Sequence, residues 1–176
     1  MHKRIRFLTV GALAVVLVGT SACSSEEQPA QPMADTVTME NQWANAAETG
    51  MAAVFGSLAN TGGRDAQIVG GSSPQAGHVE IHEVVADELG GKMMREKDGG
   101  LTVPAGETRE LIPGGDHLML MDLTQPLLPG ADITVTLEFE DGSTLPVTAQ
   151  IRDFAGGGEE YSPDTETEGG AHHHHG

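Results

Sequence analysis

The amino-acid sequence predicts an all-β fold, a two-sheet sandwich of short and mostly antiparallel strands. Short apolar runs with alternating polarity recur from Val37 onward, and no stretch keeps a helical period long enough to form a stable helix. Turn residues separate these runs, and the 24 glycines suit tight turns between strands. Aromatic residues make up only 3% of the chain, so the core must consist largely of Val, Leu, Ile, Ala and Met.

Nine strands are expected along the chain, each bounded by residues that favour turns. They cover residues 37–39, 52–58, 67–70, 78–85, 92–95, 108–111, 117–123, 132–138 and 144–151. The turn signals between them are rich in Gly, Pro, Asn and Asp, and stand at residues 60–63, 90–91, 98–100, 113–115, 129–130 and 141–142. Short strands with this regular punctuation are typical of a β-sandwich.

The first 35 residues are expected to precede the folded domain. Basic residues at positions 3, 4 and 6 are followed by an apolar run at 7–18 and small residues at 20–22, which is the layout of a signal peptide over residues 1–22. The small residues directly before Cys23 resemble the lipobox of bacterial lipoproteins, which implies a lipidated Cys23; an unmodified cysteine after a plain signal peptide is the alternative. Residues 23–35 are polar and contain Pro29 and Pro32, so we expect a lipid-anchored, flexible tether at the extracytoplasmic face of a membrane.

Composition argues against several functional classes. A net charge of −17 disfavours nucleic acid as a partner, because phosphate binding requires a basic surface. Cys23 is the single cysteine, so the domain is expected to contain no disulfide, no cysteine-based zinc site and no cysteine nucleophile. The sequence also contains no G-x-S-x-G, phosphate-loop or H-E-x-x-H motif, and we expect no enzymatic activity.

Two of the expected strands gather potential metal ligands on one face. In residues 78–82 the two apolar side chains point towards the core, so the opposite face carries His78, Glu80 and His82. In residues 117–121 the two leucines take the core face, which leaves the opposite face to His117, Met119 and Met121. Met121 is interpreted either as a side chain that packs over the site or as a spare ligand.

These residue types favour copper, and Cu(I) in particular. Thioethers are soft ligands that prefer Cu(I), imidazole binds copper in either oxidation state, and hard cations prefer several oxygen ligands. His117 and Met119 stand about 6.6 Å apart along a strand, so both can lean onto one ion. His82 and either Met93 or Met94 would come from a neighbouring hairpin, closed by a Gly90-Gly91 turn.

Several motifs between residues 43 and 151 carry a resemblance to a known family. They are Q-W-A-N-A, S-L-A-N-T-G, G-G-S-S-P-Q-A-G-H-V-E-I-H-E, K-M-M-R, V-P-A-G-E-T, L-I-P-G-G-D-H-L-M-L-M and L-E-F-E-D-G. In combination they resemble the PCuAC family of periplasmic copper chaperones. The resemblance implies a cupredoxin-like β-sandwich, here over residues 36–154, and delivery of Cu(I) to respiratory copper centres such as those of cytochrome c oxidase.

The resemblance also implies a ligand set. The family's Cu(I) site combines a histidine, a distant methionine and a later His-x-Met, which fall on His82, Met94, His117 and Met119. The family's usual spacing after the histidine would select Met93, but alignment on Met-Arg selects Met94. Glu83 and Asp116 flank the two histidines and could orient them, although strand parity places both on the other face.

The end of the chain and the partner are less constrained. Residues 155–176 are rich in Gly, Glu and Thr and are expected to be disordered. They contain a run of four histidines, which is either a candidate Cu(II) site or a purification-tag remnant: His172, His173, His174 and His175. We expect a monomer whose partner is a copper-accepting protein, either an oxidase subunit or another chaperone. A copper-buffering lipoprotein is the alternative, and an electron carrier is disfavoured because blue-copper sites require a cysteine thiolate in the domain.

Overall fold

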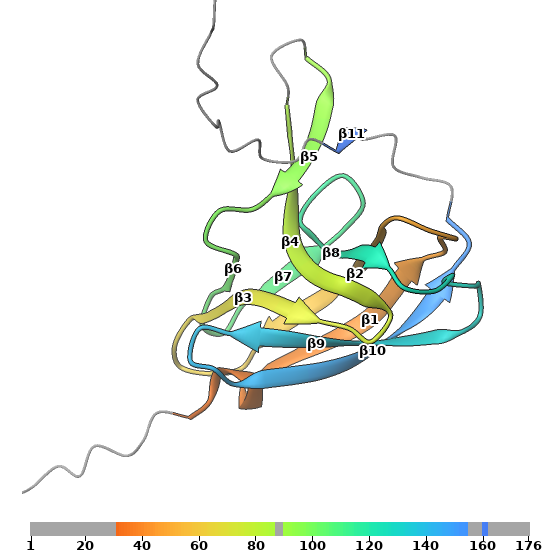
Figure 1. Cartoon of the computed structure of the whole chain (residues 1–176). Coiled ribbons are helices and arrows are strands. Elements are labelled where there is room, and N and C mark those ends of the chain that lie inside the picture. The colour runs from red at the N-terminus through yellow and green to blue at the C-terminus, as the bar shows by residue number, and fades with distance from the viewer. Residues whose placement is uncertain (1–30, 87–89, 155–159, 162–176) are drawn as a thin grey trace, which may run out of the picture. The chain divides into compact units, whose positions relative to one another are not determined.

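The computed structural model describes residues 31–86, 90–154 and 160–161 (Figure 1). In that part of the chain a short 3₁₀ turn, η1 (Met33–Asp35), precedes eleven β-strands. The strands are β1 (Val37–Asn45), β2 (Ala52–Asn60), β3 (Ala66–Ser72), β4 (Ala76–Ala86), β5 (Lys92–Glu96), β6 (Leu101–Val103), β7 (Thr108–Leu111), β8 (His117–Leu123), β9 (Asp132–Phe139), β10 (Thr144–Arg152) and β11 (Glu160–Tyr161). The predicted all-β fold is confirmed.

The strands form one continuous sheet that closes on itself. Its order is β11-β5-β4-β8-β2-β1-β10-β9-β3-β6, with β7 beside β2, and β4 pairs additionally with β3. The closing contact is Gly71 opposite Val79, and the result is a barrel-like sandwich. A Cβ at Gly71 would lie 2.7 Å from the carbonyl oxygen of Thr136, so only glycine allows β3, β4 and β9 to approach this closely.

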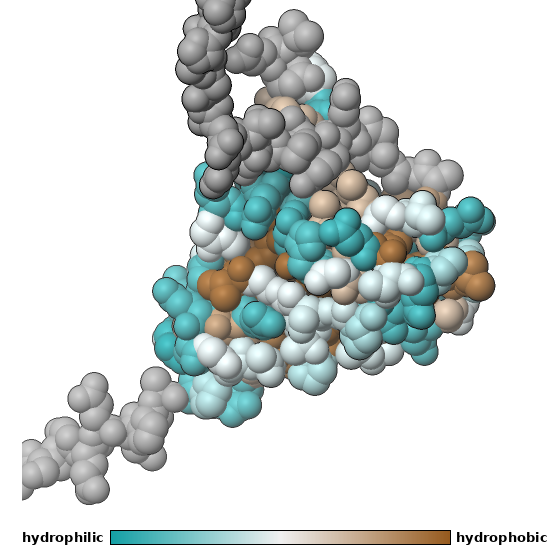
Figure 2. Space-filling model, in the orientation of Figure 1, coloured by the Kyte–Doolittle hydropathy of each residue, from teal (hydrophilic) through white to brown (hydrophobic). Residues whose placement is uncertain are grey.

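Alternation along the strands fills the core. In β9 the buried side chains are Ile133, Val135, Leu137 and Phe139, and the residues between them face outward. β8 departs from this pattern, because residues 117–121 are all buried, between 0% and 9% exposed. Both faces of β8 are therefore covered, which encloses its polar and thioether side chains. Figure 2 shows a largely polar surface on the face in view, with hydrophobic residues in separate patches.

The nine predicted strands all occur in the structure, with differences at their ends. β7 and β8 have the predicted bounds, whereas β1 continues to Asn45. A bulge between Glu40 and Trp43, with Asn41 at φ 54°, shifts the register of β1 and breaks its alternating pattern. The prediction missed β6, which is three residues long, and β11.

Both segments expected to flank the domain contain residues that belong to elements of the fold. η1 lies within the predicted tether, and its Met33 is buried against the core. The backbone N–H of Met33 donates to Asp141 (2.8 Å), which attaches η1 to the β9–β10 hairpin. β11 lies within the predicted tail and pairs in parallel with β5. The predicted signal peptide, Cys23 and the histidine run lie outside the described residues.

No helix among the described residues is long and apolar enough to cross a bilayer.

Candidate metal centre

The two predicted ligand faces lie directly opposite each other in the sheet. β4 and β8 are antiparallel neighbours, and the ladder pairs each polar residue of β4 with a candidate ligand of β8: His78 with Met121, Glu80 with Met119, and His82 with His117. Residues paired in this way project from the same face of a sheet. Parity along two separate strands thus leads to one cluster of imidazole, carboxylate and thioether groups.

A projecting hairpin brings a methionine to this cluster. The pairing of β4 with β8 ends at His82, where β4 continues beside β5 as an arm that rises from the body of the barrel (Figure 1). Met94 lies opposite Val84, two residues beyond His82, and therefore on the face of His82. Met93 lies opposite Val85 and takes the other face. Of the two alternatives, the register brings Met94 to the cluster.

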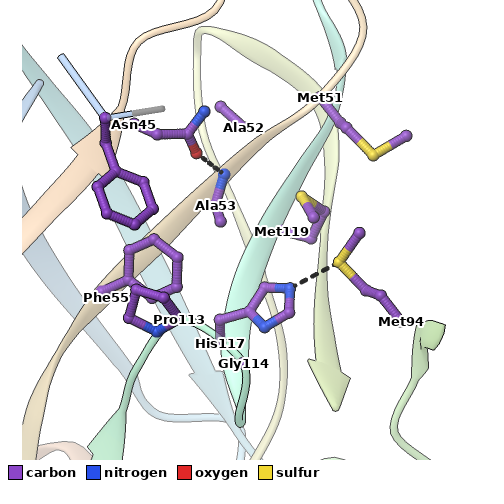
Figure 3. A pocket seen from close by; sticks show the side chains of 11 residues that line it. Asn45, Met51, Ala52, Ala53, Phe55, Met94, Pro113, Gly114, His117 and Met119 are labelled. Atoms are coloured by element: carbon purple, nitrogen blue, oxygen red, sulfur yellow. Dashed lines mark hydrogen bonds between the residues drawn. The ribbon is translucent and has the colours of Figure 1, made fainter. Parts of the chain in front are cut away.

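His117 and Met94 face each other across the candidate site. Nε2 of His117 lies 3.0 Å from Sδ of Met94, as Figure 3 shows. Nδ1 of His117 lies 2.9 Å from the carbonyl oxygen of Gly115, to which a protonated Nδ1 donates. This hydrogen bond leaves the lone pair on Nε2, directed at Met94. Around a tetrahedral ion, with bonds of about 2.0 Å to nitrogen and 2.3 Å to sulfur, these two donor atoms lie about 3.5 Å apart. A small increase in the distance between Nε2 of His117 and Sδ of Met94 would therefore let one ion bind both.

His82 is the most enclosed member of the cluster. Its ring is 0% exposed and lies 5.7 Å from the ring of His117, centroid to centroid. Two imidazoles bound to one ion have centroids roughly 5 to 6.5 Å apart, so this separation is compatible with shared coordination. Nε2 of His82 lies 2.6 Å from Oε2 of Glu80, whose other oxygen lies 2.9 Å from Nε2 of His78. Glu80 therefore fixes the orientation of the His82 ring.

A cavity of about 250 Å³ opens beside His117. It is lined by Asn45, Met51, Ala52, Ala53, Phe55, Met94, Pro113, Gly114, His117, Met119 and Phe154. The small Ala53 lies opposite Met119 in the β2–β8 ladder, which leaves space above the thioether. Figure 3 shows three methionine side chains with His117 along this cavity. His82 is not among the lining residues; it is the neighbour of His117 on β4 and is fully buried.

Comparison with known proteins decides the family. Residues 37–151 match the family described as "Putative lipoprotein LpqE-like". The chain belongs to the LpqE-like family. The LpqE-like chain is also 41% identical over 165 residues to "Putative lipoprotein Lxx21020" of Leifsonia xyli subsp. xyli (strain CTCB07), a match that covers 92% of this chain and 99% of that relative.

Solved structures connect the LpqE-like chain to PCuAC domains. The copper-bound PCuAC domain from PmoF2 superposes with a TM-score of 0.56 at 19% identity, over 68% of this chain and 94% of that one. The solution structure of CuI-DR1885 from Deinococcus radiodurans has a TM-score of 0.51 at 28% identity, over 76% of this chain and 87% of that one. The resemblance to PCuAC domains inferred from the sequence motifs is confirmed.

The two acidic residues considered as orienting groups have another partner in this LpqE-like domain. Nζ of Lys97 lies 2.7 Å from Oε2 of Glu83 and 3.2 Å from Oδ1 of Asp116. The hydrogen bond from Lys97, together with that from Arg95, lowers the pKa of Glu83, and the bond to Glu83 raises the pKa of Lys97. Each carboxylate adjoins one of the two histidines, so Lys97 ties together the backbone segments that hold His82 and His117.

Two residues of the candidate site were not proposed as functional from the sequence. Glu80 stands two residues before His82 on the same strand face, and that spacing was the available signal for a carboxylate that orients the ring. Met51 lies outside the shared sequence motifs, and from sequence a lone methionine is more often core filler than a ligand. Its place at the cavity follows from the β2–β8 register, which the sequence does not reveal.

Proposed function

We propose that this LpqE-like protein is an extracytoplasmic copper chaperone that carries Cu(I). The observation that carries the proposal is the approach of His117 Nε2 to Met94 Sδ at 3.0 Å, beside a cavity also lined by Met119. An imidazole nitrogen and two thioethers at one cavity form a soft donor set, which suits Cu(I) better than a hard cation. The copper-bound PCuAC domain with the same fold supports this interpretation.

The proposed ligands are His82, Met94, His117 and Met119. Two neutral imidazoles and two thioethers leave the site with the single positive charge of Cu(I), and the Glu80 carboxylate beside His82 offsets part of the cost of burying it. Phe55 supports His117 from the barrel side, with ring centroids 5.9 Å apart. Phe55 also lines the cavity and limits the approach of water to His117 from that side.

The proposal includes export and a lipid anchor at Cys23. The family is described as lipoproteins, and a small-residue segment directly precedes the cysteine. The acceptor we propose is a respiratory copper centre such as that of cytochrome c oxidase, as the PCuAC resemblance implies. The protein acts here as a carrier without enzymatic activity, and the histidine run at residues 172–175 is a secondary Cu(II) site within this proposal.

An anaerobic Cu(I) titration against a chromophoric chelator tests the binding step. His117→Ala and Met119→Leu should each abolish tight binding of one equivalent while the thermal unfolding transition remains cooperative. Met121→Leu is the matched control, because Met121 shares the strand face but does not line the cavity. Wild-type affinity in both ligand variants would refute the proposed site.

A copper-buffering role is the second candidate, and burial of the donors favours it. His82, His117 and Met119 are 0%, 3% and 3% exposed, which slows access by an acceptor. Incubation of the Cu(I)-loaded protein with a purified oxidase copper domain, followed by native mass spectrometry, separates the two roles. Transfer within minutes supports delivery, whereas retention despite an acceptor of higher affinity supports buffering.

A further inference from the structure

Met51 has the same orientation in the sheet as the proposed ligands of β8. It directly precedes β2, in which Ala53 pairs with Met119. Residues two apart in an extended chain project to the same side, so Met51 lies on the face of Met119. The cavity lining includes both side chains together with Met94 (Figure 3). Three thioethers from separate parts of the chain therefore border one space.

The backbone that carries Met51 is held on both sides. Oδ1 of Asn45 accepts a hydrogen bond from the N–H of Ala53 (2.6 Å). The N–H of Leu123 donates to the carbonyl oxygen of Gly50 (2.9 Å), and Gly50 has a φ of +80°, a left-handed conformation that favours glycine. These contacts fix the backbone immediately before and after Met51, so the fold holds the base of its side chain at the cavity.

Met51 also differs from the methionines that fill the core. Met33 and Met39 belong to the hydrophobic core and are 7% and 9% exposed, whereas Met51 is half-buried and is not part of the core cluster. A long apolar side chain contributes less stability in such a position than in the core. Its chemistry at this location is that of a soft sulfur donor facing His117, Met94 and Met119.

We propose that Met51 is a further ligand for Cu(I) in this cavity. An ion that enters the cavity meets Met51, Met94, Met119 and His117 on its walls, whereas the buried His82 lies beside His117 and does not line the cavity. Met51 thus supplies a thioether from the accessible side, while His82 is available from the enclosed side. When the ion passes from Met51 to His82, the copper–sulfur bond breaks as a copper–nitrogen bond forms, and the copper remains Cu(I). This inference rests on the proposed copper function.

Methyl NMR of the full chain tests the assignment. The protein is labelled with [methyl-¹³C]methionine and titrated with Ag(I), a soft monovalent ion that stands in for Cu(I) without redox chemistry. At one equivalent the methyl signals of Met51, Met94 and Met119 should shift, and those of Met33 and Met39 should not. A shift of Met94 and Met119 without Met51 overturns the inference but leaves the proposed function intact. Unchanged signals for all three overturn both.

Affinity measurements separate ligation from proximity. Met51→Leu should lower the Cu(I) affinity about tenfold, because leucine preserves the apolar volume but removes the sulfur. Met93→Leu is the matched control, since Met93 is also half-buried but projects from the other face of the arm, and it should change the affinity less than twofold. An affinity of Met51→Leu equal to that of the parent chain overturns the inference, even if the methyl signal moves.

Discussion

The contact between Glu80 and His82 leads to a quantitative prediction. Glu80→Gln retains the shape of the side chain but replaces the carboxylate that lies 2.6 Å from Nε2 of the fully buried His82. A carboxylate in this position orients a ligating imidazole and increases its basicity, and loss of such a partner typically lowers metal affinity 10- to 100-fold. The variant should therefore bind Cu(I) about 1.4 to 2.8 kcal/mol more weakly than the parent chain.

Anaerobic competition with a chromophoric Cu(I) chelator measures this difference. Glu138→Gln is the matched control, because Glu138 lies on β9, is exposed, pairs with none of the proposed ligands, and also loses one negative charge. The control should change the affinity less than threefold, since a distant exposed charge is screened by solvent. An equal loss of Cu(I) affinity in the two variants would mean that the negative charge of the acidic surface causes the loss, and not the orientation of His82 by Glu80. An affinity of Glu80→Gln within twofold of the parent chain would refute the reasoning.

Three further predictions concern the arm, the ion-pair network and the N-terminal turn. Met94→Leu should remove tight Cu(I) binding, whereas Met93→Leu should retain it; chelator competition measures both, and the reverse order would contradict the hairpin register. Lys97→Met should lower the free energy of unfolding, measured by urea denaturation, by about 1 to 3 kcal/mol, because two half-buried carboxylates lose a charged hydrogen-bond donor. The control Lys92→Met, at an exposed lysine, should change this free energy by less than about 0.5 kcal/mol. Asp141→Asn should lower the melting temperature at neutral pH, because the hydroxyl of Ser143 and the N–H of Met33 hold the pKa of Asp141 at about 2 instead of 3.8. The ionised carboxylate stabilises the fold above pH 3.8, and this contribution disappears as pH falls towards 2. The difference in melting temperature between the parent chain and Asp141→Asn should therefore shrink over that range. A difference that stays constant would show that the charge of Asp141 is not its cause.

Strand positions were predictable where turn residues and alternation agree. β7 and β8 begin and end as expected because Pro and Gly punctuate the chain on either side of them. β1 was predicted too short because the bulge at Asn41 interrupts the period on which the prediction depends. Closure of the sheet was not predictable, since it depends on the contact of Gly71 with Val79, and a lone glycine in a strand pattern does not identify the strand it approaches.

The candidate site was only partly accessible from the sequence. Parity identified the faces of His82 and of His117 with Met119, because that property is local to each strand. The pairing of those faces, the choice of Met94 at His117 and the place of Met51 depend on registers between strands, which are set by the whole fold. Burial of His82 likewise follows from tertiary packing, which the local sequence of β4 does not reveal.

X-ray absorption at the copper edge tests the central claim most directly. The full-length protein, loaded anaerobically with one equivalent of Cu(I), should give scattering from both sulfur and nitrogen neighbours, because thioethers and imidazoles meet at the cavity beside His117. The sulfur contribution should fall in Met119→Leu and in Met94→Leu. A spectrum described by nitrogen and oxygen neighbours alone would contradict the account, since it would place the ion away from the methionines.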